Sequence, residues 1–232
     1  MHDVETILGA SASGLLIALA WLWFWLREDS AHPEPRRLIA LAFASGMAIV
    51  VPVIALELAV RPILVVPIYV FIAWSTIEEI AKYTIARIAV LWRKEDDEPI
   101  DPVMYMVATA LGFAAVENAL FLMSPLSGSS VFDTIQSGDL RFVGATLVHI
   151  LGSGIVGVAL GASMYASKRM HAAYTALGVI LAAALHSCFN VLILNASPAQ
   201  MMTTFFLVWM CVIAFLAILE WVKRIRPRTA RV

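Results

Sequence analysis

The stretch WSTIEEIAKY, at residues 74–83, places two adjacent glutamates, Glu78 and Glu79, inside a largely apolar segment. An ionised carboxylate at bilayer depth costs about 2.5–3.5 kcal/mol even on the mildest insertion scales, so two of them require a reason. Residues four apart share one face of a helix, which brings Lys82 beside Glu78, with Glu79 to one side. One interpretation is an intrahelical ion pair of Lys82 with Glu78 or Glu79. Such a pair leaves the other carboxylate unexplained.

The composition is that of a polytopic membrane protein. Of the 232 residues, 61% are hydrophobic and 14% are charged, whereas a soluble domain carries about 25% charge. The net charge of −1 carries no information on nucleic-acid binding, but the lack of a basic patch beyond short clusters predicts no nucleic-acid partner. We expect an all-α transmembrane bundle in the cell membrane, forming one domain over residues 1–232. Apolar windows of about 20 residues place its seven spans at 6–26, 38–60, 66–91, 103–124, 142–166, 172–195 and 200–222.

Basic residues predict the orientation of these spans. Only Arg61 and Arg141 fall on one side of an alternating arrangement. The other side carries twelve: Arg27, Arg36, Arg37, Arg93, Lys94, Lys168, Arg169, Lys223, Arg224, Arg226, Arg228 and Arg231. Because cytoplasmic loops carry the excess of Lys and Arg, we expect the N-terminus outside and the C-terminus in the cytoplasm.

Later spans carry further polar residues at a similar expected depth. Glu117 and Asn118 lie in LGFAAVENALF, His149 lies in the fifth span, and His186 and Asn190 share a face of the sixth. A lone buried acid can cap or bridge neighbouring helices, and a single buried histidine more often bridges helices than binds a ligand. At ~1.5 Å per residue, however, the two histidines, Glu117 and Glu78 fall roughly 10–17 Å below the outer ends of their spans, and Asn190 is shallower. The sequence therefore predicts one polar site in the outer half of the membrane.

Other polar and small residues have simpler interpretations. Glu57 and Glu220 lie near span ends, where a long side chain can reach the interface. The fifth span carries a stripe of glycines, which predicts close helix packing rather than catalysis. The stripe consists of Gly152, Gly154, Gly157 and Gly161.

Four elements in consecutive spans resemble the PrsW family of intramembrane proteases. They are EEIAK at 78–82, FAAVEN at 113–118, His149, and HSCFN at 186–190. The chain is similar, more distantly, to the CAAX-prenyl endopeptidase and bacteriocin-processing superfamily, whose first motif usually ends in Arg where this chain has Lys82. The resemblance covers about 66–195, which is the expected catalytic core.

The resemblance implies hydrolysis of peptide bonds in membrane-anchored substrates, such as single-pass anti-sigma factors. Peptide hydrolysis requires an activated water, a base and a partner for the oxyanion. Glu78 is the candidate base, with Glu79 as the alternative, and Lys82 and Asn118 belong to the same site. His149 and His186 would bind a metal or the water, with Glu117 as the third metal ligand. Asn190 would orient His186 or polarise the scissile carbonyl.

The metal and the activity each have an alternative. Two histidines and a carboxylate match a catalytic zinc site, but the chain lacks HExxH and the CAAX-type relatives resemble metal-free glutamate enzymes. Buried acids and histidines also serve as proton relays in transporters. A proton-coupled permease and a catalytically silent homologue that binds membrane proteins therefore remain alternatives to the protease.

Overall fold

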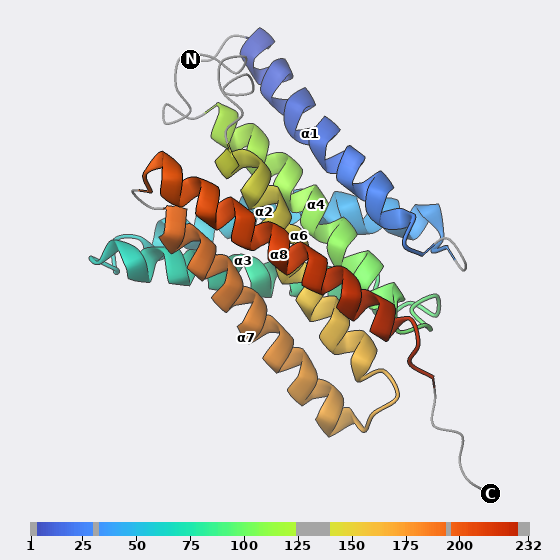
Figure 1. Cartoon of the computed structure of the whole chain (residues 1–232). Coiled ribbons are helices and arrows are strands. Elements are labelled where there is room, and N and C mark those ends of the chain that lie inside the picture. The colour runs from blue at the N-terminus through green and yellow to red at the C-terminus, as the bar shows by residue number, and fades with distance from the viewer. Residues whose placement is uncertain (1–3, 30–32, 124–139, 194–195, 227–232) are drawn as a thin grey trace, which may run out of the picture.

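The computed structural model describes residues 4–29, 33–123, 140–193 and 196–226, and every regular element in these ranges is an α-helix (Figure 1). The helices are α1 (Val4–Leu26), α2 (Arg36–Val60), α3 (Pro67–Ala89), α4 (Asp101–Leu122), α6 (Leu140–Ala162), α7 (Lys168–Ile193) and α8 (Pro198–Val222). Their bounds lie within a few residues of the seven expected spans. The expected span ends at 124 and 195, and the basic residues Arg228 and Arg231, lie outside the described residues.

Six of these helices are long and apolar enough to cross a membrane, which confirms the predicted polytopic helical bundle. The exception is α3, which is long enough at 23 residues but carries four charged side chains. Three of these, Glu78, Glu79 and Lys82, are buried in the bundle. Helix α3 thus contributes three charged side chains to the interior.

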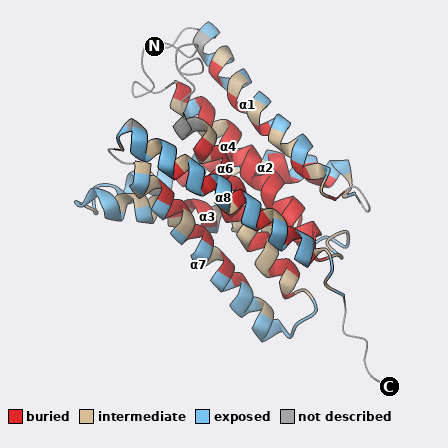
Figure 2. Cartoon of the chain, viewed as in Figure 1, coloured by how far each residue is buried: buried red, intermediate tan, exposed pale blue. Residues whose placement is uncertain are grey.

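Helices α4 and α6 form the centre of the bundle. Of their apolar stretches, 78% and 72% of the residues are buried, compared with 39% or less in α1, α2, α7 and α8. Figure 2 shows this difference as buried ribbon in the middle and exposed surface on α1, α7 and α8. The outer surfaces carry large apolar side chains such as Leu16, Val51 and Ile180, which suit contact with lipid.

Glycines allow the central helices to approach closely. A Cβ atom on Gly46 of α2 would lie 1.9 Å from the carbonyl oxygen of Thr109 in α4, and one on Gly112 would lie 1.9 Å from that of Phe43. In α6, a Cβ on Gly157 would lie 2.5 Å from the Cα of Val103. These distances are too short for any side chain, so the packing role predicted for the glycine stripe is confirmed at Gly157.

Ion pairs join the connections at one end of the bundle. Lys223, after α8, lies 3.0 Å from Glu28, after α1. Arg37, at the start of α2, lies 2.8 Å from Glu95, between α3 and α4. The helices therefore alternate in direction, as the predicted topology requires.

Candidate active site

Helix α3 holds the paired glutamates in its middle, one turn before Lys82. The helix begins at Pro67, whose fixed φ suits a first helical position. The Lys82 Nζ donates to Oε1 of Glu79 at 2.6 Å, and neither side chain is exposed. The structure thus assigns the ion pair to Glu79 and leaves Glu78 outside it. Gly152 of α6 makes room for this pair, because a Cβ there would lie 3.2 Å from the Glu79 carboxyl group.

The two histidines meet beside these glutamates. The ring of His149 from α6 and the ring of His186 from α7 stand edge to face, with their centroids 4.9 Å apart. Each ring has one nitrogen next to a carboxylate: His149 Nε2 lies 2.5 Å from Glu117 Oε2, and His186 Nδ1 lies 2.9 Å from Glu79 Oε1. Carboxylates in this position orient a histidine so that its other nitrogen can bind a metal.

Glu78 completes a group that could hold a metal ion. One potential ligand atom from each of Glu78, His149 and His186 lies within 4.8 Å of the other two, and all three residues are buried. The Glu78 Oε2 atom is 3.9 Å from His149 Nδ1 and 3.8 Å from His186 Nδ1. It has no hydrogen-bond partner among the described residues. An unpartnered buried carboxylate oxygen is costly, so this atom requires a ligand or a proton.

The donor set fits zinc in type and spacing. Zinc binds His nitrogen and carboxylate oxygen at about 2.0–2.2 Å, so tetrahedral ligands stand about 3.4 Å apart. The 3.9 Å between Glu78 Oε2 and His149 Nδ1 needs only a small contraction. His186 would bind through Nε2, because its Nδ1 contacts Glu79. The His149 Nδ1 atom also lies 3.0 Å from Lys82 Nζ, and Glu79 remains as a partner for Lys82 if His149 binds a metal.

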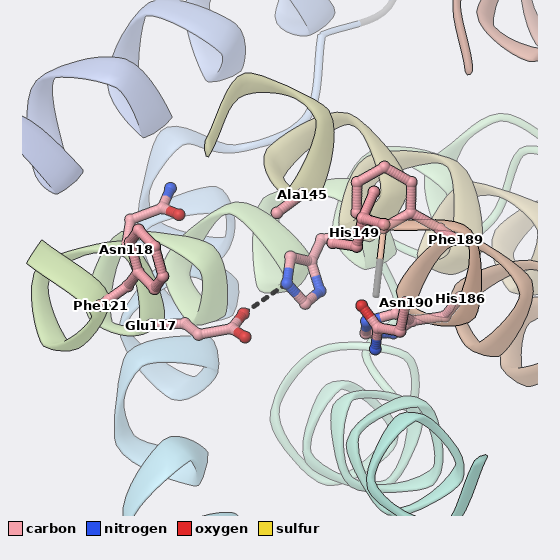
Figure 3. A pocket seen from close by; sticks show the side chains of 9 residues that line it. Glu117, Asn118, Phe121, Ala145, His149, His186, Phe189 and Asn190 are labelled. Carbon is pink, nitrogen blue, oxygen red and sulfur yellow. Dashed lines mark hydrogen bonds and ion pairs between the residues drawn. The ribbon is translucent and has the colours of Figure 1, made fainter. Parts of the chain in front are cut away.

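Glu117, which the sequence suggested as the third metal ligand, lies beside this group. It is absent from the group of converging ligand atoms, and its side chain is 43% exposed, compared with 8% for Glu78. Together with His149, His186 and Asn190 it lines a cavity of about 70 Å³, which is room for more than one water molecule. Figure 3 shows the Glu117 carboxylate directed at His149 from α4, on the opposite wall from His186 and Asn190.

The two asparagines reach the same cavity and are fixed by hydroxyl groups. Asn118 donates from Nδ2 to Thr146 Oγ1 at 2.9 Å, and Asn190 donates from Nδ2 to Ser75 Oγ at 3.0 Å. Neither hydroxyl was predicted to belong to the site. The available signal was their spacing, because Thr146 and Ser75 each precede a site residue by three positions and share its helix face.

Glu57 was also missed, because we interpreted it as a side chain at a span end. Its carboxyl group interacts with that of Glu78 and electrostatically with that of Glu117. Helix α2 is held there by Trp74, whose Nε1 donates to the Glu57 carbonyl oxygen at 3.3 Å. Only the packing of α2 on α3 brings Glu57 to the site, so no local pattern could have identified it.

The site lies toward the end of the bundle opposite the Lys223–Glu28 ion pair. At ~1.5 Å per residue, Glu117 is about 8 Å from the end of α4, and His186 is about 10 Å from the end of α7. His149 is about 14 Å from the start of α6, and Glu78 lies midway along α3. All eight predicted site residues are thus brought together from four helices at similar depth.

Comparison with known proteins gives one consistent family. Residues 34–218 match the PrsW family of intramembrane metalloproteases. The chain is 26% identical to Protease PrsW of Geobacillus kaustophilus over 161 residues, 68% of each chain. It is 26% identical to that of Oceanobacillus iheyensis over 215 residues, covering 90% of this chain and 94% of the relative. For the Bacillus subtilis protein the identity is 22% over 182 residues, 77% and 80% of the two chains.

No solved structure matches the chain. The family match covers most of the chain and includes all four helices that supply the site, in the order α3, α4, α6 and α7. The chain therefore belongs to the PrsW family of intramembrane metalloproteases, and it is a multi-pass membrane protein.

Proposed function

We propose that this protease hydrolyses a peptide bond of a membrane-anchored protein, with zinc held by Glu78, His149 and His186. The observation that carries the proposal is the position of Glu78 Oε2, buried without a partner within 4 Å of both histidines. Bound zinc would act as a Lewis acid and would lower the pKa of a coordinated water. The cavity beside the histidines supplies the space in which that water meets the substrate.

Glu117 is the general base in this proposal. Its Oε2 atom is next to His149, which leaves Oε1 to accept a proton from a water molecule in the cavity it lines. As the water oxygen attacks the carbonyl carbon, Glu117 takes the proton. It then gives the proton to the amide nitrogen as the C–N bond breaks. This exchanges the roles that the sequence suggested, in which Glu78 was the base and Glu117 the ligand.

The remaining polar groups position the reacting ones. Glu79 is held by Lys82 and orients His186 through Nδ1. The side-chain amide of Asn190 donates one hydrogen to Ser75 Oγ. Its second amide hydrogen is available to polarise the scissile carbonyl in the cavity. Such donors stabilise the negative charge that develops on the carbonyl oxygen.

The substrate is a single-pass protein such as an anti-sigma factor, cut in the outer half of the membrane. The depth of Glu117 and His186 supports this position, because the peptide bond must reach the cavity that they line. The family assignment supports the protease over a transporter or permease. The full set of site residues argues against a catalytically silent homologue.

The test compares two nearly isosteric variants, Glu78→Gln and Glu117→Gln, in cleavage of a single-pass substrate and in zinc content by mass spectrometry. We expect both to lose about 10²–10⁴-fold in cleavage rate. Only Glu78→Gln should lose zinc, because Glu117 is not a ligand. Glu220→Gln, with its side chain 54% exposed at the far end of α8, is the control and should change neither quantity.

Three results would contradict the proposal. Zinc loss in Glu117→Gln with zinc retained in Glu78→Gln would restore the roles suggested by the sequence. Full activity of zinc-free protein, prepared with a chelator and verified by metal analysis, would establish a metal-free glutamate mechanism. Cleavage at the wild-type rate by both variants would remove both carboxylates from the mechanism.

A further inference from the structure

A second, larger cavity lies between α3 and α7, at the end of the bundle away from the active site. Its volume is about 890 Å³, and it extends from Lys168 at the start of α7 to Ile180, with Tyr83 and Arg87 of α3 on its other side. Along α7, Ala172, Ala176 and Ile180 are exposed, so the cavity opens on the outer surface of the bundle. None of its lining residues belongs to the catalytic cavity.

Two cationic side chains, one in the last turn of α3 and one at the start of α7, line this cavity. Arg87 and Lys168 both line it, and neither forms an ion pair in the described part of the chain. The Arg87 guanidinium donates to the carbonyl oxygen of Leu91 at 3.3 Å and lies over the Trp92 ring, which fixes its direction and leaves donors free. Asp96 attracts Arg87 electrostatically, but it does not line the cavity.

Apart from Tyr83, His171 and Thr175, the rest of the cavity lining is apolar, and the cavity is about as long as one leaflet is deep. From Lys168 to Ile180 the wall along α7 measures about 18 Å, and the hydrocarbon region of one leaflet is about 15 Å deep. Val179 and Ile180 form its deep end. Between this end and Lys168, the small side chains of Ala172 and Ala176 leave an open channel beside α3. The cations therefore lie at headgroup level when the apolar wall lies in the bilayer.

We propose that this cavity binds one anionic phospholipid, with its phosphate on Arg87 and Lys168 and an acyl chain along α7. Basic pockets between transmembrane helices bind anionic headgroups, and each nearby cation contributes about 1 kcal/mol, or about fivefold in affinity. The apolar wall identifies the ligand as a lipid, since a free phosphate would use only the cationic end. The site does not depend on the proposed catalytic mechanism.

The test measures lipid retention by native mass spectrometry of the full chain, released from micelles containing equal phosphatidylglycerol and phosphatidylcholine. We expect the wild type to retain phosphatidylglycerol selectively. Removing both cations in R87Q/K168Q should lower this preference about 30-fold. The control R93Q/K94Q removes the same charge at the same end of the bundle, outside the cavity, and should keep the preference.

A second variant tests the apolar part. Ala176→Phe fills the channel from an exposed position, which should preserve folding while reducing retention of phosphatidylglycerol to that of phosphatidylcholine. Equal retention by the wild type and R87Q/K168Q would overturn the proposal, as would unchanged retention by Ala176→Phe. Displacement of the lipid by millimolar inorganic phosphate would also overturn it, because the site would then recognise the anion alone.

Discussion

The Lys82 side chain has no exposed surface, yet its ammonium group must keep its charge balanced inside the bundle. Glu79 provides the opposite charge at 2.6 Å. Two of the proposed metal ligands contact this pair, because His149 lies next to Lys82 and His186 lies next to Glu79. Removing one member of a buried ion pair leaves an uncompensated charge, whereas replacing both members with neutral groups is often tolerated. The pair is therefore a scaffold for the site, and its contribution is measurable apart from catalysis.

Lys82→Met should destabilise the protein strongly. Loss of a buried partner costs about 3–5 kcal/mol, and we expect the lower end because His186 still contacts Glu79. The double variant Glu79→Gln/Lys82→Met should recover part of the loss, since no charge remains unpaired. Thermal unfolding in detergent measures both variants. A single variant as stable as the wild type, or a double variant less stable than the single one, would contradict the pairing.

The crossing of α2 over α4 depends on two glycines with no room for a side chain. Gly46→Ala would place a Cβ 1.9 Å from the Thr109 carbonyl oxygen, and because that atom is backbone, the helices must separate. Overpacking of this kind costs about 1–3 kcal/mol, which outweighs the gain of about 1 kcal/mol in helix propensity. Gly9→Ala in α1, where a Cβ meets nothing within 4 Å, should be neutral or stabilising in the same unfolding measurement. Equal effects of the two substitutions would mean that the contact is absent.

The connection between α1 and α2 predicts a dependence of stability on pH. Glu34 accepts a hydrogen bond from Tyr105, and burial, with the nearby Asp101 carboxylate, raises the pKa of Glu34 to about 8. Burial likewise raises the pKa of Asp96 to about 7. The folded state therefore binds more protons than the unfolded state between about pH 4.5 and 8, and stability falls as pH rises through this window.

The variant Glu34→Gln keeps an acceptor for Tyr105 but cannot ionise. Its melting temperature should fall less than that of the wild type between pH 5 and pH 8.5. Glu95→Gln is the matched control, because a backbone hydrogen bond and the Arg37 guanidinium lower the pKa of Glu95. That control should retain the wild-type decline above pH 5. A Glu34→Gln profile as steep as that of the wild type would exclude Glu34 as a source of the effect.

Sequence reasoning identified the four site helices because each has a local signal. Residues four apart in EEIAK and HSCFN lie on the same side of a helix. The spacing therefore predicted that Glu78 and Lys82 share one helix face and that His186 and Asn190 share another. The choice of Glu79 as the partner of Lys82 was not predictable, since His186 from α7 also binds Glu79. The helix face on which a residue lies can be derived from sequence. The partner with which its side chain pairs depends on the side-chain conformations that neighbouring helices permit.

Contacts between helices that are distant in sequence account for the rest. Glu57 reaches Glu78 only through the packing of α2 on α3, and Ser75 meets Asn190 across 115 positions of sequence. The exchange of roles proposed for Glu78 and Glu117 has the same origin. The sequence pattern indicates that both are buried acids. Only the packing of α4 on α6 leaves Glu117 on the cavity wall, and only the packing of α3 on α6 and α7 brings Glu78 beside the histidines.

The orientation of the whole bundle decides from which side of the membrane its substrates are cut. Helix directions alternate, and the ion pairs Lys223–Glu28 and Arg37–Glu95 gather the strongly basic connections at one end. The active site lies toward the other end, near the connection between α2 and α3. The positive-inside rule assigns the basic end to the cytoplasm, so we predict that the site opens toward the outer leaflet.

Cysteine labelling on intact cells measures this orientation. Val65→Cys, at a position 91% exposed between α2 and α3, should react with an impermeant maleimide, and Lys94→Cys, exposed between α3 and α4, should react only after permeabilisation. Both variants require Cys188 and Cys211 to be replaced by Ala so that no native thiol contributes. If Lys94→Cys, and not Val65→Cys, were labelled on intact cells, the orientation in the membrane would be the opposite of the predicted one. The catalytic cavity would then open toward the cytoplasm, and substrates would be cut in the inner leaflet despite the twelve basic residues that predict the opposite.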